Sequence, residues 1–437
     1  MLLIIINKEP SMSDLTEYAK SAKKASQILA TLSTSVKNKA LENIASALIA
    51  SSEDIFRANE EDVSRSEAEN LDKPLLKRLK FREEKINDCV AGIKGLISLE
   101  DPVGKLSMHE TLDDGLELYR VSCPIGVIGV IFESRPDALV QIASLCLKSG
   151  NAVFLKGGSE AIKTNRILAD IIYRTGVESG LPEGWLHLLE SRADVTEMLD
   201  LSDYIDLIIP RGSNAFVKYI MTHTSIAVLG HADGVCHTYI HKDCDPEMAI
   251  KVATDAKTQY VSVCNATETI LVDKELKDTL LPKLCEHLKS LGVELYGDEY
   301  MAAQFGAEPV TEWHHEYLDM KVSVKIVDGI DDAIAHINAY GSGHTDAIIT
   351  NDKEAAEKFM LGVDSGSVYV NCSTRFADGF RYGFGAEVGV STSKIHARGP
   401  VGLEGLMSYK YKLYGSGSIV ADYASGAKTF KHIKHNI

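Results

Sequence analysis

The 437-residue chain is 45% hydrophobic, which allows a large buried core, and it is too long for one domain of typical size, so we expect two or three domains. Its 62 acidic and 46 basic residues give a formal net charge of −16, which would repel nucleic acid and anionic membranes and excludes both as general partners. An anionic small molecule stays compatible with this charge where basic residues gather locally.

The eight cysteines, at positions 89, 123, 146, 236, 244, 264, 285 and 372, are scattered and form no CxxC pair. This usage is typical of reduced thiols in a cytosolic enzyme rather than of a disulfide framework. The opening MLLIIINKEP is too short to span a bilayer and has no basic segment before it, and no later segment reaches a transmembrane length. We therefore expect a cytoplasmic protein.

Residues 11 to about 100 carry apolar side chains at three- and four-residue spacing, which predicts helices. The next stretch, 108–123, contains two alternating runs on either side of Asp114-Gly115, a turn signal that predicts a β-hairpin. The tail from Leu403 onward alternates like a strand, and we expect it to pair with another segment or another subunit.

From Ile125 the pattern becomes strand, loop, helix. Strands are predicted at 126–132 and 151–158, with helices after them that end at Gly150 and Gly176. The same alternation continues toward the C-terminus, with strands predicted at 236–241, 266–273, 322–328, 345–350 and 366–372. Strands separated by helices of this length predict parallel sheets with helices on their faces.

Two loops follow predicted strands and resemble each other. Lys156 ends one strand, and Gly157, Gly158 and Ser159 lead into a helix; Arg211, Gly212 and Ser213 follow another strand in the same way. Backbone N–H groups at a helix N-terminus beside a cation make a phosphate or ribose site. Each loop alone is also compatible with a plain strand-to-helix turn, but two at strand ends favour a cofactor site.

The stretch HADGVCHTYIHKDCD has the composition of a metal site, with His231, Cys236, His237, His241 and Cys244 close in sequence. The spacing matches no common zinc pattern, and side chains on one strand alternate between the faces of a sheet. We therefore expect no metal here.

Cys264 lies between a predicted helix and a predicted strand, flanked by Ser262 and Asn265. An isolated cysteine is commonly a buried structural thiol. A loop position between two domains instead favours a thiolate that attacks a substrate opposite a bound cofactor.

Three stretches closely resemble the gamma-glutamyl phosphate reductase family of the aldehyde dehydrogenase superfamily, also called glutamate-5-semialdehyde dehydrogenases. They are PIGVIGVIFESRP…FLKGGSEAIKTN at 124–165, SVCNATETILV at 262–272 and NCSTRFADGFRYGFG…EGL at 371–406. The resemblance runs from about residue 14 to about residue 415. It implies an α/β, aldehyde dehydrogenase-like fold with two Rossmann-like parallel-sheet domains and a small oligomerisation hairpin and strand.

The resemblance also implies roles. Cys264 matches the nucleophile, and Lys156 matches the lysine that binds the adenosine ribose and its phosphate. Ser159 stands where a carboxylate often accompanies NAD preference, so NADP is favoured. The positions that it assigns to the cofactor are Ser134, Lys156, Gly157, Ser159, Arg211, Gly212, Ser213, Leu229, Gly230 and Glu316.

Two positions depart from the superfamily pattern. Val228 in VLGH stands where oxidising aldehyde dehydrogenases carry a glutamate that activates water against a thioester. Ser134 and Arg135 in ESRP stand where the oxyanion asparagine is found, so the Cys264 backbone N–H is the donor that remains. A reductase that starts from an acyl phosphate needs no water-activating base, which fits Val228.

The resemblance therefore implies NADPH-dependent reduction of L-glutamyl 5-phosphate to L-glutamate 5-semialdehyde through a Cys264 thioester, the second step of proline biosynthesis. An anionic substrate requires local basic residues, and the substrate-binding candidates are Arg135, Asn265, Arg375, Asp378 and Arg381. The arginines are equally compatible with surface or interdomain ion pairs.

Two rival functions remain at this point. One is an aldehyde-oxidising dehydrogenase on the same fold, against which Val228 argues. The other is a cysteine hydrolase that uses Cys264 with a histidine such as His237 and binds no nicotinamide.

We expect residues 1–107 and 124–235 to form the NADP-binding domain and 236–400 the catalytic domain. Residues 108–123 and 401–437 are the expected oligomerisation segments of a homo-oligomer, a dimer or tetramer. A glutamate 5-kinase is the expected protein partner, if the labile substrate is channelled.

Overall fold

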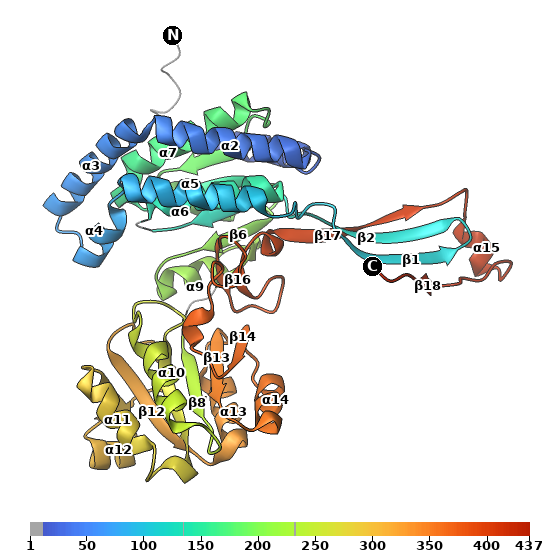
Figure 1. Ribbon diagram of the computed structural model, residues 1–437. Helices are drawn as coiled ribbons and strands as arrows, with labels where there is room; N and C mark the ends of the chain where they lie inside the picture. Colours follow the sequence, from blue (N-terminus) through green and yellow to red (C-terminus); the bar gives the residue numbers. More distant parts are fainter. Residues whose placement is uncertain (1–11, 134, 231–232) are drawn as a thin grey trace.

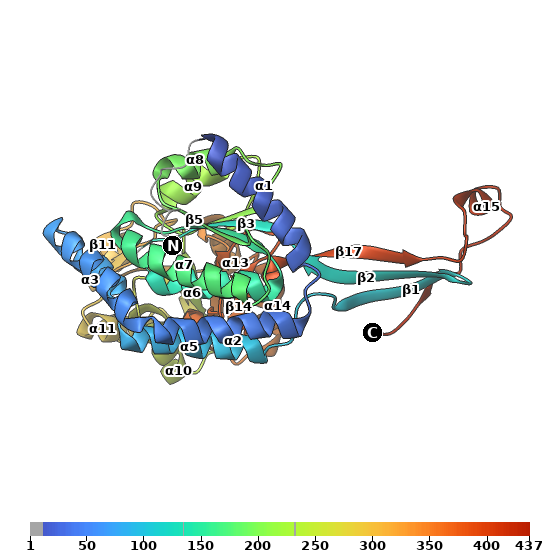
Figure 2. The same ribbon diagram turned by 90° about the horizontal axis from the view of Figure 1, so that it is seen from above.

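The computed structural model describes residues 12–133, 135–230 and 233–437. It has an upper lobe with a five-stranded sheet, a lower lobe with a seven-stranded sheet, and a long arm that projects from the upper lobe (Figures 1 and 2). Among the described residues, no helix combines the length and the apolar character needed to cross a membrane.

The upper lobe begins with five helices, as the apolar spacing predicts. They are α1 (Met12–Leu29), α2 (Thr34–Ala50), α3 (Ser52–Ala68), α4 (Lys73–Leu79) and α5 (Glu83–Ser98). Its five strands are all parallel and lie in the order β5-β4-β3-β6-β7: β3 (Val127–Ile131), β4 (Ala152–Lys156), β5 (Leu186–Leu189), β6 (Leu207–Pro210) and β7 (Ala227–Val228). The connecting helices are α6 (Pro136–Ser149), α7 (Ile162–Glu178), α8 (Arg192–Leu199) and α9 (Asn214–Thr222).

Helix α6 ends at Gly150 as predicted, because Gly150 adopts the left-handed conformation at φ 76°. The prediction that the next helix ends at Gly176 is wrong, since α7 continues to Glu178. A Cβ at Gly176 would lie 2.9 Å from the ring of Trp185 and from Leu181, so this glycine serves close packing inside the helix. A glycine that packs and a glycine that ends a helix look the same in a sequence.

The lower lobe has a parallel sheet in the order β11-β10-β12-β9-β8-β13-β14. Its strands are β8 (Cys236–Ile240), β9 (Thr267–Asp273), β10 (Glu294–Gly297), β11 (Glu308–Pro309), β12 (Lys321–Val327), β13 (Thr345–Ile349) and β14 (Ser367–Val370). Its helices are α10 (Pro246–Thr258), α11 (Leu281–Ser290), α12 (Glu299–Phe305), α13 (Gly329–Tyr340) and α14 (Lys353–Gly362). The sequence pattern did not predict β10, α12 and β11.

Alternation along β9 gives the lower sheet two apolar faces. Ile270 and Val272 pack in one core with residues of α10 and α11, whereas Leu271 packs on the other side with residues of α13 and α14. Both faces are therefore covered by helices, as a parallel sheet requires.

The arm is an antiparallel sheet in the order β17-β2-β1-β18. β1 (Leu106–Asp113) and β2 (Leu116–Pro124) form the predicted hairpin, and Gly115 in its turn has φ 72°. β17 (Met407–Tyr414), the strand predicted in the tail, pairs with β2 of the same chain, and β18 (Ile433–Lys434) pairs with β1. A short helix, α15 (Val420–Ala424), lies at the far end of the arm (Figure 1).

Residues 386–406 join the lobes and the arm. β15 (Gly389–Ser391) and β16 (Gly399–Val401) form a small antiparallel pair. Val388, Val401 and Leu406 pack in the core of the upper lobe, although they follow the lower sheet in sequence.

Candidate active site around Cys264

Cys264 lies in the turn between α10 and β9 and is half-buried. The backbone of Gly234 packs directly against it, because a Cβ at Gly234 would lie 2.4 Å from both the Cα and the carbonyl oxygen of Cys264. From the neighbouring strand, the Cys236 thiol donates a hydrogen bond to the Cys264 carbonyl at 3.1 Å. The position of the thiol is therefore fixed from β8 and from the chain that leads into it.

Two arginines from distant segments lie within electrostatic range of this thiol. Arg211 follows β6 of the upper sheet, and Arg375 is buried in the short 3₁₀ turn η3 (Thr374–Phe376). Burial lowers the pKa of both guanidinium groups, and a negative charge on Cys264 raises it in both. Arg135 is a further positive charge near Arg211 and lowers its pKa. The structure thus brings together Cys264, Arg211 and Arg375 from three separate segments.

The other predicted substrate residues hold the loop that carries Arg375. Asn265 donates from Nδ2 to the Ala377 carbonyl at 2.8 Å, and Thr374 Oγ1 donates to the Asn265 carbonyl at 2.7 Å. Arg381 donates from Nη1 to the Arg375 carbonyl at 2.6 Å, and Asp378 accepts the Arg381 backbone N–H at 3.2 Å. Asn265 Oδ1 is buried without a hydrogen-bond partner among the described residues, so it remains an acceptor for a bound molecule.

Lys156 is buried at the end of β4 and donates from Nζ to the Gly157 carbonyl at 2.5 Å. Burial lowers the pKa of its ammonium group, and the Glu160 carboxylate is the strongest of the charges that oppose this shift. A Cβ at Gly157 would lie 2.1 Å from Asn165 Nδ2, so any other residue here would displace the Asn165 side chain. Ser159 is exposed at the start of the 3₁₀ turn η1 (Ser159–Ala161), and its carbonyl accepts a hydrogen bond from Arg65 at 2.9 Å.

The N-terminus of α7 is not open in the way that the sequence predicts. Asp62 of α3 is fully buried and accepts the backbone N–H of Lys163 at 3.3 Å and that of Thr164 at 2.8 Å. These two amides are therefore already paired with a carboxylate. An anion bound here would depend on side chains such as Lys156 for its hydrogen bonds. Asp62 lies 101 positions before Lys163 and 102 before Thr164, so the local loop pattern cannot reveal it as a capping residue.

The second loop differs. Ser213 is the N-cap residue of α9 and makes no side-chain capping bond among the described residues. Gly212 packs against Glu133, whose Oε1 would lie 3.0 Å from a Cβ at this position.

The remaining predicted cofactor residues lie elsewhere. Leu229 is buried and donates its N–H to the Ile208 carbonyl at 2.9 Å, and Gly230 follows it beside Pro210. Glu316 Oε2 accepts from Asn214 Nδ2, in the first residue of α9, at 3.2 Å. Ser134 lies outside the described residues.

The histidines and cysteines near β8 do not converge. His237 Nδ1 lies 3.0 Å from Asp346 Oδ1, and His241 Nδ1 lies 2.9 Å from Thr350 Oγ1. His231 lies outside the described residues. The Cys236 thiol contacts the Cys264 carbonyl, whereas the His237 ring lies against Asp346 and has its centroid 5.5 Å from that of the His336 ring of α13. This geometry argues against the hydrolase rival.

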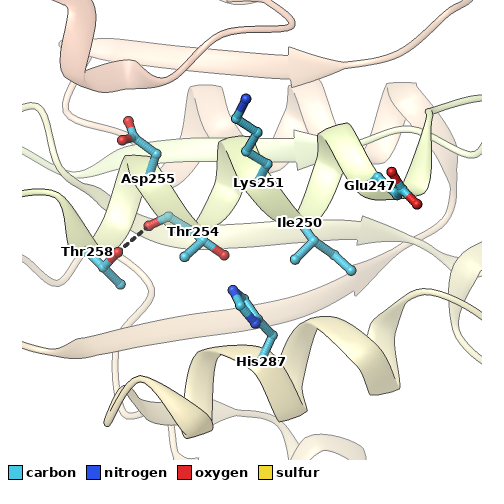
Figure 3. Close-up of a pocket in the computed structure, with 7 residues that line it drawn as sticks. All are labelled: Glu247, Ile250, Lys251, Thr254, Asp255, Thr258 and His287. Atoms are coloured by element: carbon cyan, nitrogen blue, oxygen red, sulfur yellow. Dashed lines mark hydrogen bonds between the residues drawn. The ribbon is translucent and has the colours of Figure 1, made fainter.

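A separate groove of about 550 Å³ lies between α10 and α11 (Figure 3). Ile250 and Thr254 of α10 face His287 of α11 across it. None of the predicted site residues lines this groove, so it is not the candidate active site.

The sequence matches the model of the Aldehyde dehydrogenase family over residues 7–309 and 322–411. It is 61% identical to the gamma-glutamyl phosphate reductase of Pelotomaculum thermopropionicum over 425 residues, which cover 97% of this chain and 98% of the relative. It is 61% identical to the protein of the same name from Acetivibrio thermocellus over 424 residues, with the same coverage.

Solved structures agree with these sequence matches. The crystal structure of the gamma-glutamyl phosphate reductase of Thermotoga maritima superposes with a TM-score of 0.90 at 38% identity and covers 93% of this chain and 99% of that one. A betaine aldehyde dehydrogenase of Staphylococcus aureus in complex with NAD+ has a TM-score of 0.62 at 16% identity, over 96% of this chain and 93% of that one, and it shares the fold alone.

Proposed function

The chain belongs to the aldehyde dehydrogenase family and, within it, to the gamma-glutamyl phosphate reductases, and from this premise we propose that it reduces L-glutamyl 5-phosphate to L-glutamate 5-semialdehyde and phosphate in proline biosynthesis. The observation that supports this most directly is the half-buried Cys264 thiol beside the two cationic side chains Arg211 and Arg375. Nearby positive charge attracts an anionic acyl phosphate.

In the first step, the Cys264 thiolate attacks the acyl carbon. The C–S bond forms, the C–O bond to the phosphate breaks, and phosphate leaves with the bonding electron pair. Arg135, Arg375 and Arg381 are the candidates to bind the anionic groups of the substrate, and Asp378 is the candidate to meet the substrate α-ammonium. The Cys264 backbone N–H donates to the oxyanion that develops on the acyl oxygen.

The second step starts from the thioester on Cys264. A reduced nicotinamide, when bound, would supply the hydride for the thioester carbonyl carbon. The Cys264 thiohemiacetal then expels the thiolate, which releases the aldehyde and regenerates the nucleophile. Val228 at the position of a water-activating glutamate fits this route, because a thioester that awaits a hydride must be protected from water.

The residues of the upper lobe fit a nicotinamide dinucleotide, and we propose NADP as the preferred form. Lys156 is the buried cation, and the N-terminus of α9, which has no side-chain capping bond among the described residues, follows Arg211, Gly212 and Ser213 and suits a pyrophosphate. Ser159 places no carboxylate beside the 2′-phosphate. Glu160 argues against this fit, since its negative carboxylate lies near Lys156 and raises the pKa of that ammonium group. Separate titrations with NADPH and NADH test this preference.

We propose the domain division that follows from these roles: residues 1–107 and 124–235 bind NADP, and 236–400 carry the nucleophile. Residues 108–123 and 401–437, most of which lie in the arm, mediate a homo-oligomer, a dimer or tetramer. β17 is an edge strand with an exposed row of large side chains, Tyr409, Tyr411, Leu413 and Tyr414, and an unprotected edge of this kind requires a cover. Sedimentation of the intact chain and of a variant with these four residues changed to serine tests this role.

Two further proposals concern the cellular setting. All eight cysteines are free, which suits a reducing cytoplasm. The labile substrate requires a kinase that phosphorylates the glutamate side chain, and a glutamate 5-kinase is the proposed partner for direct transfer. Loss of product when a competing trap for the free acyl phosphate is added to the coupled enzymes would count against this transfer.

The experiment that tests the proposed function measures the reduction of enzymatically generated L-glutamyl 5-phosphate. The rate is read from the loss of NADPH as it is oxidised. Arg375→Met should raise KM for the acyl phosphate strongly, because the buried guanidinium is lost from the site. An unchanged KM would remove Arg375 from the substrate site.

A further inference from the structure

A buried ion pair brackets the turn of the nucleophile. Lys257 lies in the last turn of α10 and Glu268 is the second residue of β9, so the pair stands on both sides of Cys264 in sequence. Lys257 Nζ lies 2.6 Å from Glu268 Oε2, and both side chains are fully buried. Neither residue belongs to the catalytic steps described above.

The second oxygen of Glu268 holds another loop. The Leu318 backbone N–H donates to Glu268 Oε1 at 3.2 Å, and Leu318 has a positive φ of 52°. A bulky side chain rarely adopts this conformation, so the surrounding contacts must hold it there. On the same loop, the Leu318 carbonyl accepts from Ser262 Oγ, two residues before Cys264, at 3.4 Å. The Cys264 turn and the 313–319 loop are therefore fastened together.

The far side of the 313–319 loop reaches the upper lobe. Glu316 accepts a hydrogen bond from Asn214, which begins α9 directly after the Arg211–Ser213 loop. His314 Nε2 lies 3.6 Å from Asp233 Oδ2, next to the Gly234 that packs on Cys264. A continuous set of contacts thus leads from Glu268 through the 313–319 loop to the proposed cofactor loop.

Stability alone does not explain the buried pair. Moving two charges out of water is costly, and well-packed apolar side chains of similar volume are often equally or more stable in such a place. The Glu268 carboxylate joins α10, β9 and the 313–319 loop, so it is well placed to fix the positions of these segments relative to one another. We propose that Glu268, paired with Lys257, is a positioning residue that aligns the Cys264 turn with the 313–319 loop and so sets the nucleophile relative to the cofactor.

The electrostatics agree with this role. Burial raises the pKa of Glu268 to about 7, and Lys257 is the largest influence that opposes the shift. Loss of Lys257 would raise this pKa further, so that a larger fraction of the carboxyl group would be neutral near pH 7. The neutral form lacks the charge that strengthens the bond to the Leu318 N–H.

The test compares two double variants that differ in one property. Lys257→Met/Glu268→Gln removes both charges but keeps an oxygen that accepts from Leu318, whereas Lys257→Met/Glu268→Leu also removes the acceptor. The readouts are thermal unfolding, the alkylation rate of Cys264 by iodoacetamide resolved by peptide mass spectrometry, kcat and the KM for the acyl phosphate. The inference rests on Cys264 as the nucleophile of the proposed function, but the alkylation readout requires no substrate.

We expect the alkylation rate and kcat of the Leu double variant to fall about tenfold below those of the Gln double variant, with similar melting temperatures and little change in KM. Equal alkylation and equal kcat in the two variants would overturn the inference, as would a loss that follows the melting temperature. Failure of the proposed function would look different, because wild type would then show no turnover of the acyl phosphate.

Discussion

Gly234→Ala tests whether the close approach of two backbones sets the position of the nucleophile. The added Cβ would lie 2.4 Å from the Cys264 Cα and carbonyl oxygen and 2.6 Å from its Cβ, whereas ordinary contacts begin near 3.4 Å. The Cys264 turn must therefore move by roughly 1 Å (3.4 minus 2.4), since these contacts are with backbone and Cβ atoms rather than with the end of a flexible side chain. A displacement of this size near the chemistry reduces a rate by about 10²-fold.

The assay is NADPH oxidation by the acyl phosphate, with kcat and the melting temperature measured on the same preparation. We expect kcat to fall about 10²-fold and stability to fall by about 1–3 kcal/mol, the usual consequence of overpacking. Gly92→Ala is the matched control, because Gly92 lies inside α5 with nothing within 4 Å of the added Cβ. A Gly234→Ala enzyme with the kcat of wild type would show that this contact does not position Cys264.

Three further predictions concern single residues of the site. Cys264→Ser should abolish turnover and leave NADPH affinity nearly unchanged in a fluorescence titration, because a serine alkoxide is not available at neutral pH; ordinary turnover would remove Cys264 from the mechanism. Ser159→Glu should weaken NADPH binding far more than NADH binding, since it places a carboxylate beside the 2′-phosphate; an equal loss for both would refute the placement of Ser159. Val228→Glu should allow NADP-dependent oxidation of the semialdehyde to free glutamate without phosphate, because general-base activation of water typically speeds such a step by about 10²- to 10⁴-fold. Free glutamate no higher than the wild-type level would mean that residue 228 does not face the thioester.

Local patterns predicted the framework of the fold well. The Asp114-Gly115 turn and its flanking alternation predicted the hairpin of the arm, and the apolar runs predicted the strands that carry Lys156 and Arg211 on one parallel sheet. These features depend on residues close in sequence, where turn chemistry and periodicity act directly. The same patterns could not show that β17 covers the hairpin of its own chain rather than that of another subunit.

Long-range contacts explain what the sequence did not show. Asp62 caps α7 from a distant helix, so the loop after Lys156 is less open than its glycines indicate. The link from Glu268 to Leu318 joins residues 50 positions apart, and only the folded chain places them together. Arg375 was predicted as a substrate-binding residue from a family resemblance rather than from spacing, and this role stays a prediction, since a charge in an irregular loop has no periodicity to reveal its partner.

The central claim is that Cys264 transfers its acyl group to and from phosphate and not to water. The most direct measurement is the reverse reaction, in which glutamate 5-semialdehyde reduces NADP with and without phosphate while the glutamate formed is quantified. We expect reduction to require both phosphate and Cys264, with little free glutamate at early times. Reduction at the same rate without phosphate, with free glutamate accumulating in equal amount, would contradict the account and favour an aldehyde-oxidising dehydrogenase.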